Sequence, residues 1–228
     1  MVKLKTRLFP FFFVLILLLP LTFLPKGEIV LWVNGYRNPT LDAFFIRASA
    51  LGNGLTVLIA VVLVFPFRLK WLGIFILSFL FQVLIVLLLK KGIFNGELRP
   101  YLYYKEAGQV HLLNLVEGVK IRYVNTFPSG HTATISFLVT FFAILARNTV
   151  ASWTLMLVGL LVGFSRIYLV QHFFNDVYFG ILFGLLSSMV GYYYIQKYPR
   201  KWHSYKIKIN LQNIQRTTQS ALKQLFQN

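Results

Sequence analysis

Apolar runs separated by short polar stretches dominate the hydrophobic pattern of this chain. Several approach the roughly 20 residues that a bilayer crossing requires. Six runs are predicted to be transmembrane helices, at residues 8–24, 55–67, 71–89, 132–146, 152–167 and 173–195. The first has no small-residue cleavage site behind it and is interpreted as a retained helix. The run at 55–67 is short, so its helix is expected to begin nearer Leu51.

A different pattern stands between the first two runs. Apolar residues recur there at helical spacing, at Leu41, Phe44, Phe45, Ala48 and Leu51. Polar residues fall on the opposite side, at Asp42, Arg47 and Ser49. This pattern predicts a short amphipathic helix that lies at the outer membrane interface.

After Tyr198-Pro199 the chain turns polar and rich in glutamine. We therefore divide it into an integral membrane domain, 1–197, and a basic polar cytoplasmic tail, 198–228. An approximate apolar stripe runs through the tail from Ile207 to Leu225. The tail is either a solvated segment or a helix on the inner leaflet.

Composition supports a membrane protein. The chain is 57% hydrophobic and only 13% charged, which is too apolar for a soluble domain of 228 residues. It contains no cysteine, so disulfides and thiolate metal sites are excluded. The net charge of +17 comes from basic residues that flank apolar runs, a pattern that fits anionic lipid headgroups rather than nucleic acid.

Charge also predicts the orientation. With six spans and the N-terminus inside, most basic residues fall on the inner side and all six acidic residues fall on the outer side. This is the asymmetry of the positive-inside rule. The long loop at 90–131 and the turn between the last two spans are then predicted to face outside.

The residues whose side chains could bind a ligand or take part in catalysis lie in three blocks on this predicted outer side. The central block, residues 127–132, reads Phe-Pro-Ser-Gly-His-Thr and opens an apolar helix, with Ser129 or Thr132 as its cap and His131 in its first turn. A helix start presents unpaired N–H groups that suit an anion. The other blocks are Lys90-Lys91 with Arg99-Pro100, and Ser165-Arg166 with His172 and Asp176.

The third block requires a break in the helix. Six residues turn an α-helix by about 600°, which would leave Arg166 and His172 roughly 120° apart. We therefore expect the fifth span to end near Tyr168 and a tight turn to return His172 to the head of the sixth. His172 and Asp176 are four residues apart and are expected to share a face and hydrogen-bond.

Together the three blocks resemble the signature of the type 2 phosphatidic acid phosphatase superfamily, in its membrane lipid phosphatase branch. The second and third blocks match the family spacing residue for residue. The first is longer than the family pattern, by one residue if Lys91 is the functional lysine and by two if Lys90 is. A bulge near Gly92 or Asn95-Gly96 could absorb the difference, so either lysine remains possible.

The resemblance implies a role for each residue. His172 is the expected nucleophile, which forms a phosphohistidine, and Asp176 holds its other ring nitrogen. His131 is the expected acid, which protonates the leaving group and later activates water. The phosphate is expected to be held by cationic side chains and helix-start donors, namely Lys91, Arg99, Ser129, Gly130 and Arg166. No pair of carboxylates stands in these blocks, so neither a metal nor another cofactor is expected.

The sequence therefore predicts an all-α polytopic membrane protein of the bacterial inner membrane, with a phosphatase site facing the periplasm. Expected substrates are anionic lipid phosphates or diphosphates: isoprenyl diphosphate, phosphatidylglycerophosphate, phosphatidic acid or a lipid A type glycolipid. One alternative is a catalytically weak relative that serves as a membrane scaffold, which the irregular first block supports. A transporter is disfavoured because charged residues cluster at span ends rather than mid-span.

Overall fold

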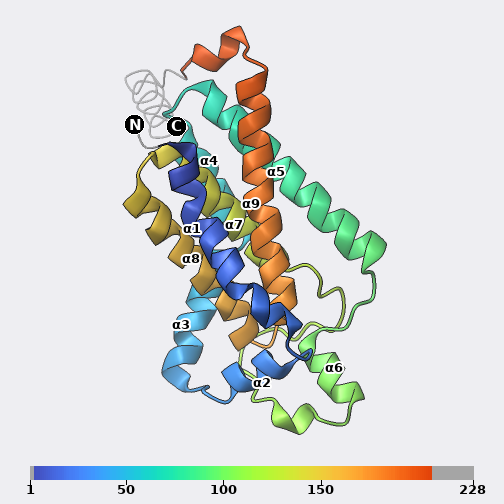
Figure 1. The fold of residues 1–228 in the computed structure, drawn as a ribbon. Helices are drawn as coiled ribbons and strands as arrows, with labels where there is room; N and C mark the ends of the chain where they lie inside the picture. The colour runs from blue at the N-terminus through green and yellow to red at the C-terminus, as the bar shows by residue number, and fades with distance from the viewer. Residues whose placement is uncertain (1–2, 207–228) are drawn as a thin grey trace, which may run out of the picture.

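The computed structural model describes residues 3–206, and Figure 1 shows them as a helical bundle without a β-strand in that range. The tail prediction from residue 207 onward lies outside the described residues. The longer helices are α1 (Leu4–Leu18), α3 (Pro39–Ala50), α4 (Gly54–Val64), α5 (Leu69–Leu88), α7 (Gly130–Ala146), α8 (Thr149–Tyr168) and α9 (Phe174–Lys197). The shorter ones are η1 (Leu19–Phe23), α2 (Glu28–Asn34), η2 (Leu89–Ile93), α6 (Pro100–Glu106), η3 (Val110–Leu112) and η4 (Lys201–Ser204).

Within residues 3–206, four helices are long and apolar enough to cross a membrane, at Leu4–Phe23, Leu69–Ile93, Thr149–Tyr168 and Phe174–Lys197. A fifth is possible if α3 and α4, which meet at a 52° bend, form one broken span. The apolar helix α7 is shorter than these. The membrane character is confirmed, while the expected number of six spans stays a prediction.

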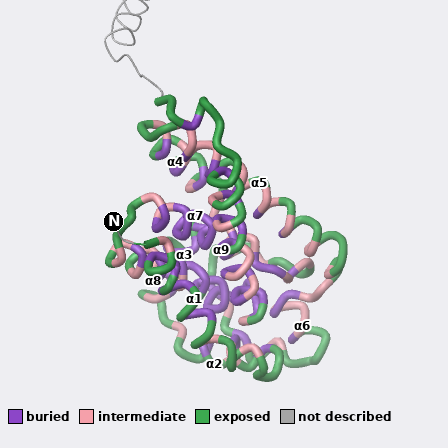
Figure 2. The backbone as a smooth tube through the Cα atoms, turned by 45° about the horizontal axis from the view of Figure 1, so that its top comes forward, coloured by how far each residue is buried: buried purple, intermediate pink, exposed green. Residues whose placement is uncertain are grey.

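Helix α7 lies at the centre of the bundle, packed by α5, α8 and α9, and Figure 2 shows its largely buried backbone. Phe137 and Phe141 of α7 each lie 5.1 Å, ring centre to ring centre, from Phe75 of α5. Glycine allows α9 to approach closely, because a Cβ at Gly184 would lie 2.4 Å from the carbonyl oxygen of Ala133. The outward faces of α4 and α5 are apolar, as in helices that contact lipid.

The amphipathic helix predicted near residue 41 exists as α3, but its predicted polar side was placed wrongly. Asp42 and Ser49 are buried, whereas Phe44 and Leu51 are exposed. The reason is hydrogen bonding, because Asp42 accepts from the Tyr168 hydroxyl at 2.7 Å and Ser49 accepts from Arg166. α3 therefore turns polar groups toward α8, and its position at the membrane interface remains a prediction.

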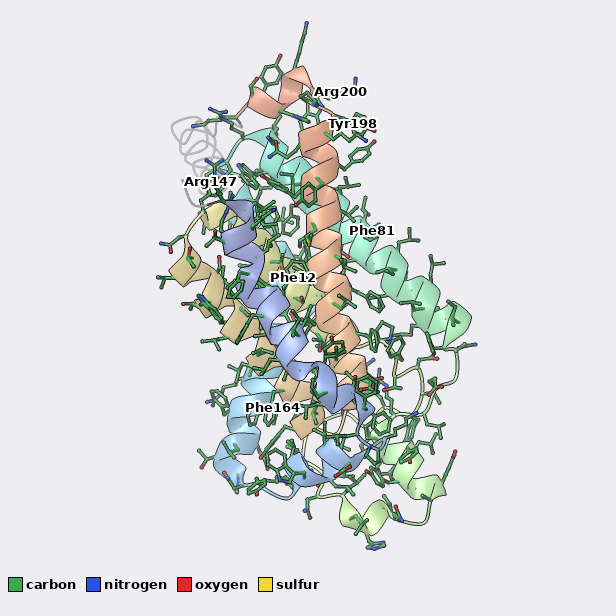
Figure 3. The ribbon with its side chains drawn as sticks, in the orientation of Figure 1. Phe12, Phe81, Arg147, Phe164, Tyr198 and Arg200 are labelled. Atoms are coloured by element: carbon green, nitrogen blue, oxygen red, sulfur yellow. The ribbon has the colours of Figure 1, made fainter. Side chains whose placement is uncertain are left out.

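The two ends of the bundle differ in what they carry. The start of α1, the α4–α5 turn, the α7–α8 turn and η4 lie at one end, while α2 and α6 lie at the other (Figures 1 and 3). An isolated bridge between Arg68 and Lys206 joins two parts of the first end. The start of α7 and the start of α9 lie at the second end, with all three motif blocks.

Candidate functional site

The central block forms the start of α7 as predicted. Ser129 is its N-cap, and the Ser129 hydroxyl oxygen accepts from the backbone N–H and the hydroxyl of Thr132, at 3.4 and 2.9 Å. The Ser129 N–H donates to the Asp176 carbonyl at 2.9 Å, which ties this start to that of α9. A Cβ at Gly130 would meet nothing within 4 Å, so the space beside the first turn is open.

The expected break between Arg166 and His172 is confirmed. Helix α8 ends at Tyr168 and α9 begins at Phe174. In the turn between them, the N–H groups of Gln171 and His172 both donate to the Arg166 carbonyl, at 2.9 and 3.2 Å. This turn brings the His172 side chain back toward Arg166, which a continuous helix could not do.

His172 is almost fully buried, with 2% of its surface exposed, and both ring nitrogens have partners. Nδ1 lies 3.3 Å from the Asp176 carboxylate and 3.3 Å from the Thr126 hydroxyl. Nε2 lies 3.2 Å from the Arg99 Nη1, which can only donate. We therefore assign the Nδ1 proton to the Asp176 side, which leaves the Nε2 lone pair facing the guanidinium.

The Asp176 carboxylate oxygen that faces His172, Oδ2, accepts two further hydrogen bonds. It accepts from the Phe173 N–H at 2.9 Å and from the Thr126 hydroxyl. Thr126 was not among the predicted site residues, although it stands directly before the central block. No pattern in the sequence marks it, because its role depends on where the loop at 107–126 folds back.

Arg99 is held in the site by backbone carbonyl groups. Leu98 pairs with Val124 as an isolated β-bridge, and the Arg99 side chain donates to the carbonyl groups of Val124 at 2.9 Å, Gln171 at 2.9 Å and Asn125 at 3.3 Å. Burial, and next the positive charge of Arg122, lower the pKa of Arg99 to about 10. It nevertheless stays charged at neutral pH.

Of the two candidate lysines, Lys90 faces the site. Its ammonium donates to the carbonyl groups of Asn125 at 2.9 Å and Thr126 at 3.4 Å. Lys91 is exposed, and among residues 3–206 it has no hydrogen bond or ion pair. The π-helical turn η2, Leu89–Ile93, holds both lysines, and a π turn accommodates an inserted residue. This turn and the positive-φ turn at Gly96 fit the longer spacing of the first block.

Arg166 closes the site from α8. Its guanidinium donates to the hydroxyl of Ser49 on α3 and, at 3.4 Å, to the side-chain oxygen of Gln171. Its Nε is buried and has no partner in the described part of the chain. A buried charged donor without an acceptor is costly, so this N–H is suited to an anionic ligand. Ser49 and Gln171 were also missed, because neither forms a recognisable pattern with Arg166.

His131 differs from His172 in having no side-chain hydrogen bond to any of residues 3–206. It is half-buried on the first turn of α7, beside the break between α3 and α4. A Cβ at Gly52 in that break would lie 2.9 Å from the His131 carbonyl oxygen, so glycine permits the close approach.

The cations of the site act together on the pKa of His172. Burial lowers the pKa of His172 well below its ordinary value, and the positive charges of Arg99, Arg166 and Lys90 add to this, with a smaller effect of His131. His172 is therefore neutral at physiological pH and keeps one unprotonated ring nitrogen. The described residues contain no group of three His, Asp or Glu side chains that could hold a metal ion.

A cavity of about 520 Å³ lies beside this site. Thr126 and Asp176 form part of its wall, and Lys26 and Glu97, an ion pair at 3.1 Å, also line it. Its other walls are mainly apolar side chains from η1, α2, η2 and α9, including Leu21, Ile29, Leu89, Phe179 and Phe183. The cavity therefore joins an apolar region to the polar site.

Comparison with known proteins agrees with this geometry. The sequence model of the PAP2 superfamily matches residues 71–200, which hold all three blocks. The chain belongs to the PAP2 superfamily. A lipid A 4'-phosphatase from Porphyromonas gingivalis is 32% identical over 180 residues, which cover 76% of this chain and 72% of that protein.

Two solved PAP2 structures share the fold. The crystal structure of LpxE from Aquifex aeolicus has a TM-score of 0.63 and 28% identity, and the match covers 75% of this chain and 97% of that one. A transmembrane PAP2 type phosphatidylglycerolphosphate phosphatase from Bacillus subtilis has a TM-score of 0.58 and 20% identity, over 86% of this chain and 99% of that one. The resemblance read from the three blocks is therefore confirmed.

Proposed function

We propose that this PAP2 protein hydrolyses a phosphate group from a membrane lipid, with His172 as the nucleophile. The observation that carries the proposal is the contact set of His172, whose Nδ1 faces Asp176 while Nε2 faces Arg99. This arrangement provides a neutral nucleophile beside a cation that attracts phosphate. Membrane lipid phosphatase activity agrees with membership of the PAP2 superfamily and with the name of the 32% identical relative.

In the first step the phosphoryl group lies among Arg99, Arg166, Lys90 and the N–H groups at the start of α7. The Nε2 lone pair of His172 attacks phosphorus, and the bond from phosphorus to the leaving oxygen breaks. Burial and the neighbouring cations lower the pKa of His131 to about 4, and the bound phosphate anion, which offsets these cations, raises it again. The protonated His131 then gives its proton to that oxygen, so that the lipid leaves as an alcohol or as a lower phosphate. Asp176 stabilises the positive imidazole ring of the phosphohistidine through Nδ1–H.

In the second step His131, now neutral, takes a proton from water. The resulting hydroxide attacks the phosphohistidine, the N–P bond breaks, and inorganic phosphate leaves. The three cations neutralise the charge that develops on the phosphoryl oxygens in both steps. The protein's own side chains thus supply this charge, and Lys90 takes the role that was expected of Lys91, because its ammonium lies within the site.

We assign the apolar cavity of about 520 Å³ to the lipid chain of the substrate. Its apolar walls suit acyl or prenyl groups, and its polar corner at Thr126 and Asp176 adjoins the catalytic pair. Among the candidate lipids we place a phosphorylated glycolipid of the lipid A type first, since the relative at 32% identity is a lipid A 4'-phosphatase. Isoprenyl diphosphate, phosphatidylglycerophosphate and phosphatidic acid follow.

The proposed location is the bacterial inner membrane, with the site at the periplasmic face. Support comes from the distribution of charge, because all six acidic residues belong to the segments at the end that carries His172. A reporter fused after Asn228 should then be cytoplasmic, and one inserted near Gly108 should be periplasmic. The opposite result would place the site in the cytoplasm.

The deciding experiment measures phosphate release by the purified protein in one detergent, from each of the four candidate lipids. Release that His172→Ala abolishes would support the proposal and would exclude the scaffold alternative. His111→Ala is the matched control, because His111 is exposed and lies outside the site. If a folded wild-type protein released no phosphate from any of these lipids, the proposed activity would be rejected.

A further inference from the structure

A second polar cavity, of about 870 Å³, lies at the end of the bundle opposite the catalytic site. It is enclosed by the start of α1, the α4–α5 turn, the α7–α8 turn and the end of α9. Figure 3 labels Arg147 and Arg200 at this end of the bundle. Helix α7 joins the two sites, and its 17 residues span about 25 Å at 1.5 Å per residue.

Basic residues dominate the wall of this cavity. Its cationic members are Lys3, Arg7, Arg68, Lys70, Arg147 and Lys206. None of the described residues that line it is acidic. The six acidic residues of the chain all belong to segments at the catalytic end, namely Glu28, Asp42, Glu97, Glu106, Glu117 and Asp176.

Arg7 adds a buried hydrogen-bond donor to the charged side chains of the cavity. Its side chain is buried, with 7% of the residue exposed, and Nη1 donates to the Ile144 carbonyl. Its Nε is buried without a partner among residues 3–206. This is the feature that Arg166 shows in the catalytic site, where an anion is expected.

The remaining walls fit a lipid headgroup. Leu4, Phe67, Trp71 and Leu145 supply apolar surface beside the cations. Lys70 donates to Gln196 at 2.6 Å, so a neutral polar group also lies at the rim. An anionic phospholipid has a charged phosphate, a polar glycerol and apolar acyl carbons in that order. These parts match the cations, the polar Gln196 and the apolar side chains of the cavity.

We propose that this cavity binds the phosphate group of an anionic membrane lipid, in the leaflet opposite the catalytic site. The phosphate accepts hydrogen bonds from Arg7 and is surrounded by the rim cations Arg68, Lys70 and Lys206. The ligand is bound and not hydrolysed, because no histidine lines the cavity within the described residues. This site does not depend on the proposed catalytic function.

The test compares two triple variants of the full chain that remove the same charge from the same end. The cavity variant is Arg68→Gln/Lys70→Gln/Lys206→Gln. The control variant is Lys197→Gln/Arg200→Gln/Lys201→Gln, whose three residues are exposed and do not line the cavity. Each protein is reconstituted in phosphatidylcholine nanodiscs with added phosphatidylglycerol, a phosphodiester that offers no monoester to hydrolyse. Native mass spectrometry then measures how much phosphatidylglycerol remains bound.

We expect the wild type and the control variant to retain phosphatidylglycerol, and the cavity variant to bind it at least about 10-fold more weakly, since each basic residue near an anionic surface contributes measurably. Equal loss in both variants would show a diffuse charge effect and overturn the proposal. A separate arm measures thermal protection by inorganic phosphate in detergent. Protection of the wild type and the control, but not of the cavity variant, with no retention of lipid, would assign the same phosphate site to a soluble anion.

Arg7→Gln gives an independent readout, because Arg7 is the buried donor. Its melting temperature is compared with and without phosphatidylglycerol. The wild type should gain stability from the lipid, whereas a folded Arg7→Gln protein should gain less. If Arg7→Gln does not fold, the rim variants alone decide the question. A full stabilisation of folded Arg7→Gln by the lipid would contradict the proposed contact.

Discussion

The two histidines of the catalytic site lie in contrasting surroundings. His172 contacts Asp176, Thr126 and Arg99 and is almost fully buried. His131 is half-buried and has no side-chain hydrogen bond within residues 3–206. One ring is held by partners at both nitrogens, while the other has no such partner within these residues.

This difference fits the two chemical tasks that we propose for these histidines. A nucleophile must present one lone pair in line with the leaving oxygen, and small misplacements are costly. An acid that later becomes a base must reach the leaving oxygen first and a water molecule afterwards. In the proposed mechanism, packing therefore holds the group that forms the covalent bond and leaves the group that moves protons without a hydrogen-bond partner among residues 3–206.

The largest effect is expected from His172→Ala. Removal of the nucleophile should abolish both turnover and the phosphoenzyme, whatever the leaving group. Rapid acid-free quenching with a radiolabelled substrate measures the phosphoenzyme, and phosphate release measures turnover. A fully active His172→Ala protein would overturn the mechanism.

The effect of His131→Ala on the rate is expected to depend on the leaving group. Loss of general acid catalysis should slow hydrolysis of a lipid phosphate by about 10²–10⁴-fold. The loss should be much smaller for an activated aryl phosphate, whose phenolate leaves without a proton. Steady-state rates on both substrates in one detergent provide the measurement. Equal losses on the two substrates would remove His131 as the acid.

The two adjacent lysines offer a matched pair for the phosphate pocket. Lys90→Gln should reduce kcat/KM by about 10–100-fold, the effect of about 1.5–3 kcal/mol of lost charge-assisted hydrogen bonding. Lys91→Gln removes the same charge from an exposed position and should leave kcat/KM within about twofold. The reverse order would show that Lys91 binds the phosphate.

A smaller effect is expected from Thr126→Val, which keeps the shape of the side chain and removes its hydroxyl. Asp176 then loses one donor and His172 loses one contact at Nδ1. We expect kcat to fall about 10-fold with little change in KM, because the hydroxyl positions the catalytic pair and does not touch the phosphate. Thr126→Ser should restore most of the rate. A similar loss in Thr126→Ser would indicate a packing role instead.

The smallest expected change is a shift in pH dependence. Since burial and neighbouring cations lower the pKa of His172, its neutral form persists to more acidic pH than for an ordinary histidine. Arg99→Gln removes one of these cations and should raise that pKa, so activity should be lost at a higher pH on acidification. The acid limb of kcat/KM on an aryl phosphate, measured for both proteins, shows the direction. An acid limb that stays in place or moves to lower pH would contradict the assignment.

Much of this protein was predictable from sequence because its signals are local. Apolar runs predicted the long helices, since a membrane span must satisfy its backbone groups internally. The spacing from Arg166 to His172 predicted the turn after Tyr168, because helix geometry alone forbids a common face. Ser129 or Thr132 was predicted as a cap from its place before an apolar run, and the structure shows that Ser129 is the cap.

Other features depended on how distant segments meet. Thr126 contacts His172 only because the loop at 107–126 folds back, and Ser49 contacts Arg166 because α3 packs against α8. Lys90 and Lys91 are identical in type, and only the π turn η2 decides which one faces the site. The basic cavity gathers residues from five separate segments, so no local pattern could reveal its depth. Sequence by itself predicted the helices and the residues that we propose for catalysis, whereas tertiary packing decided the partners of those residues, because these contacts join residues far apart in the chain.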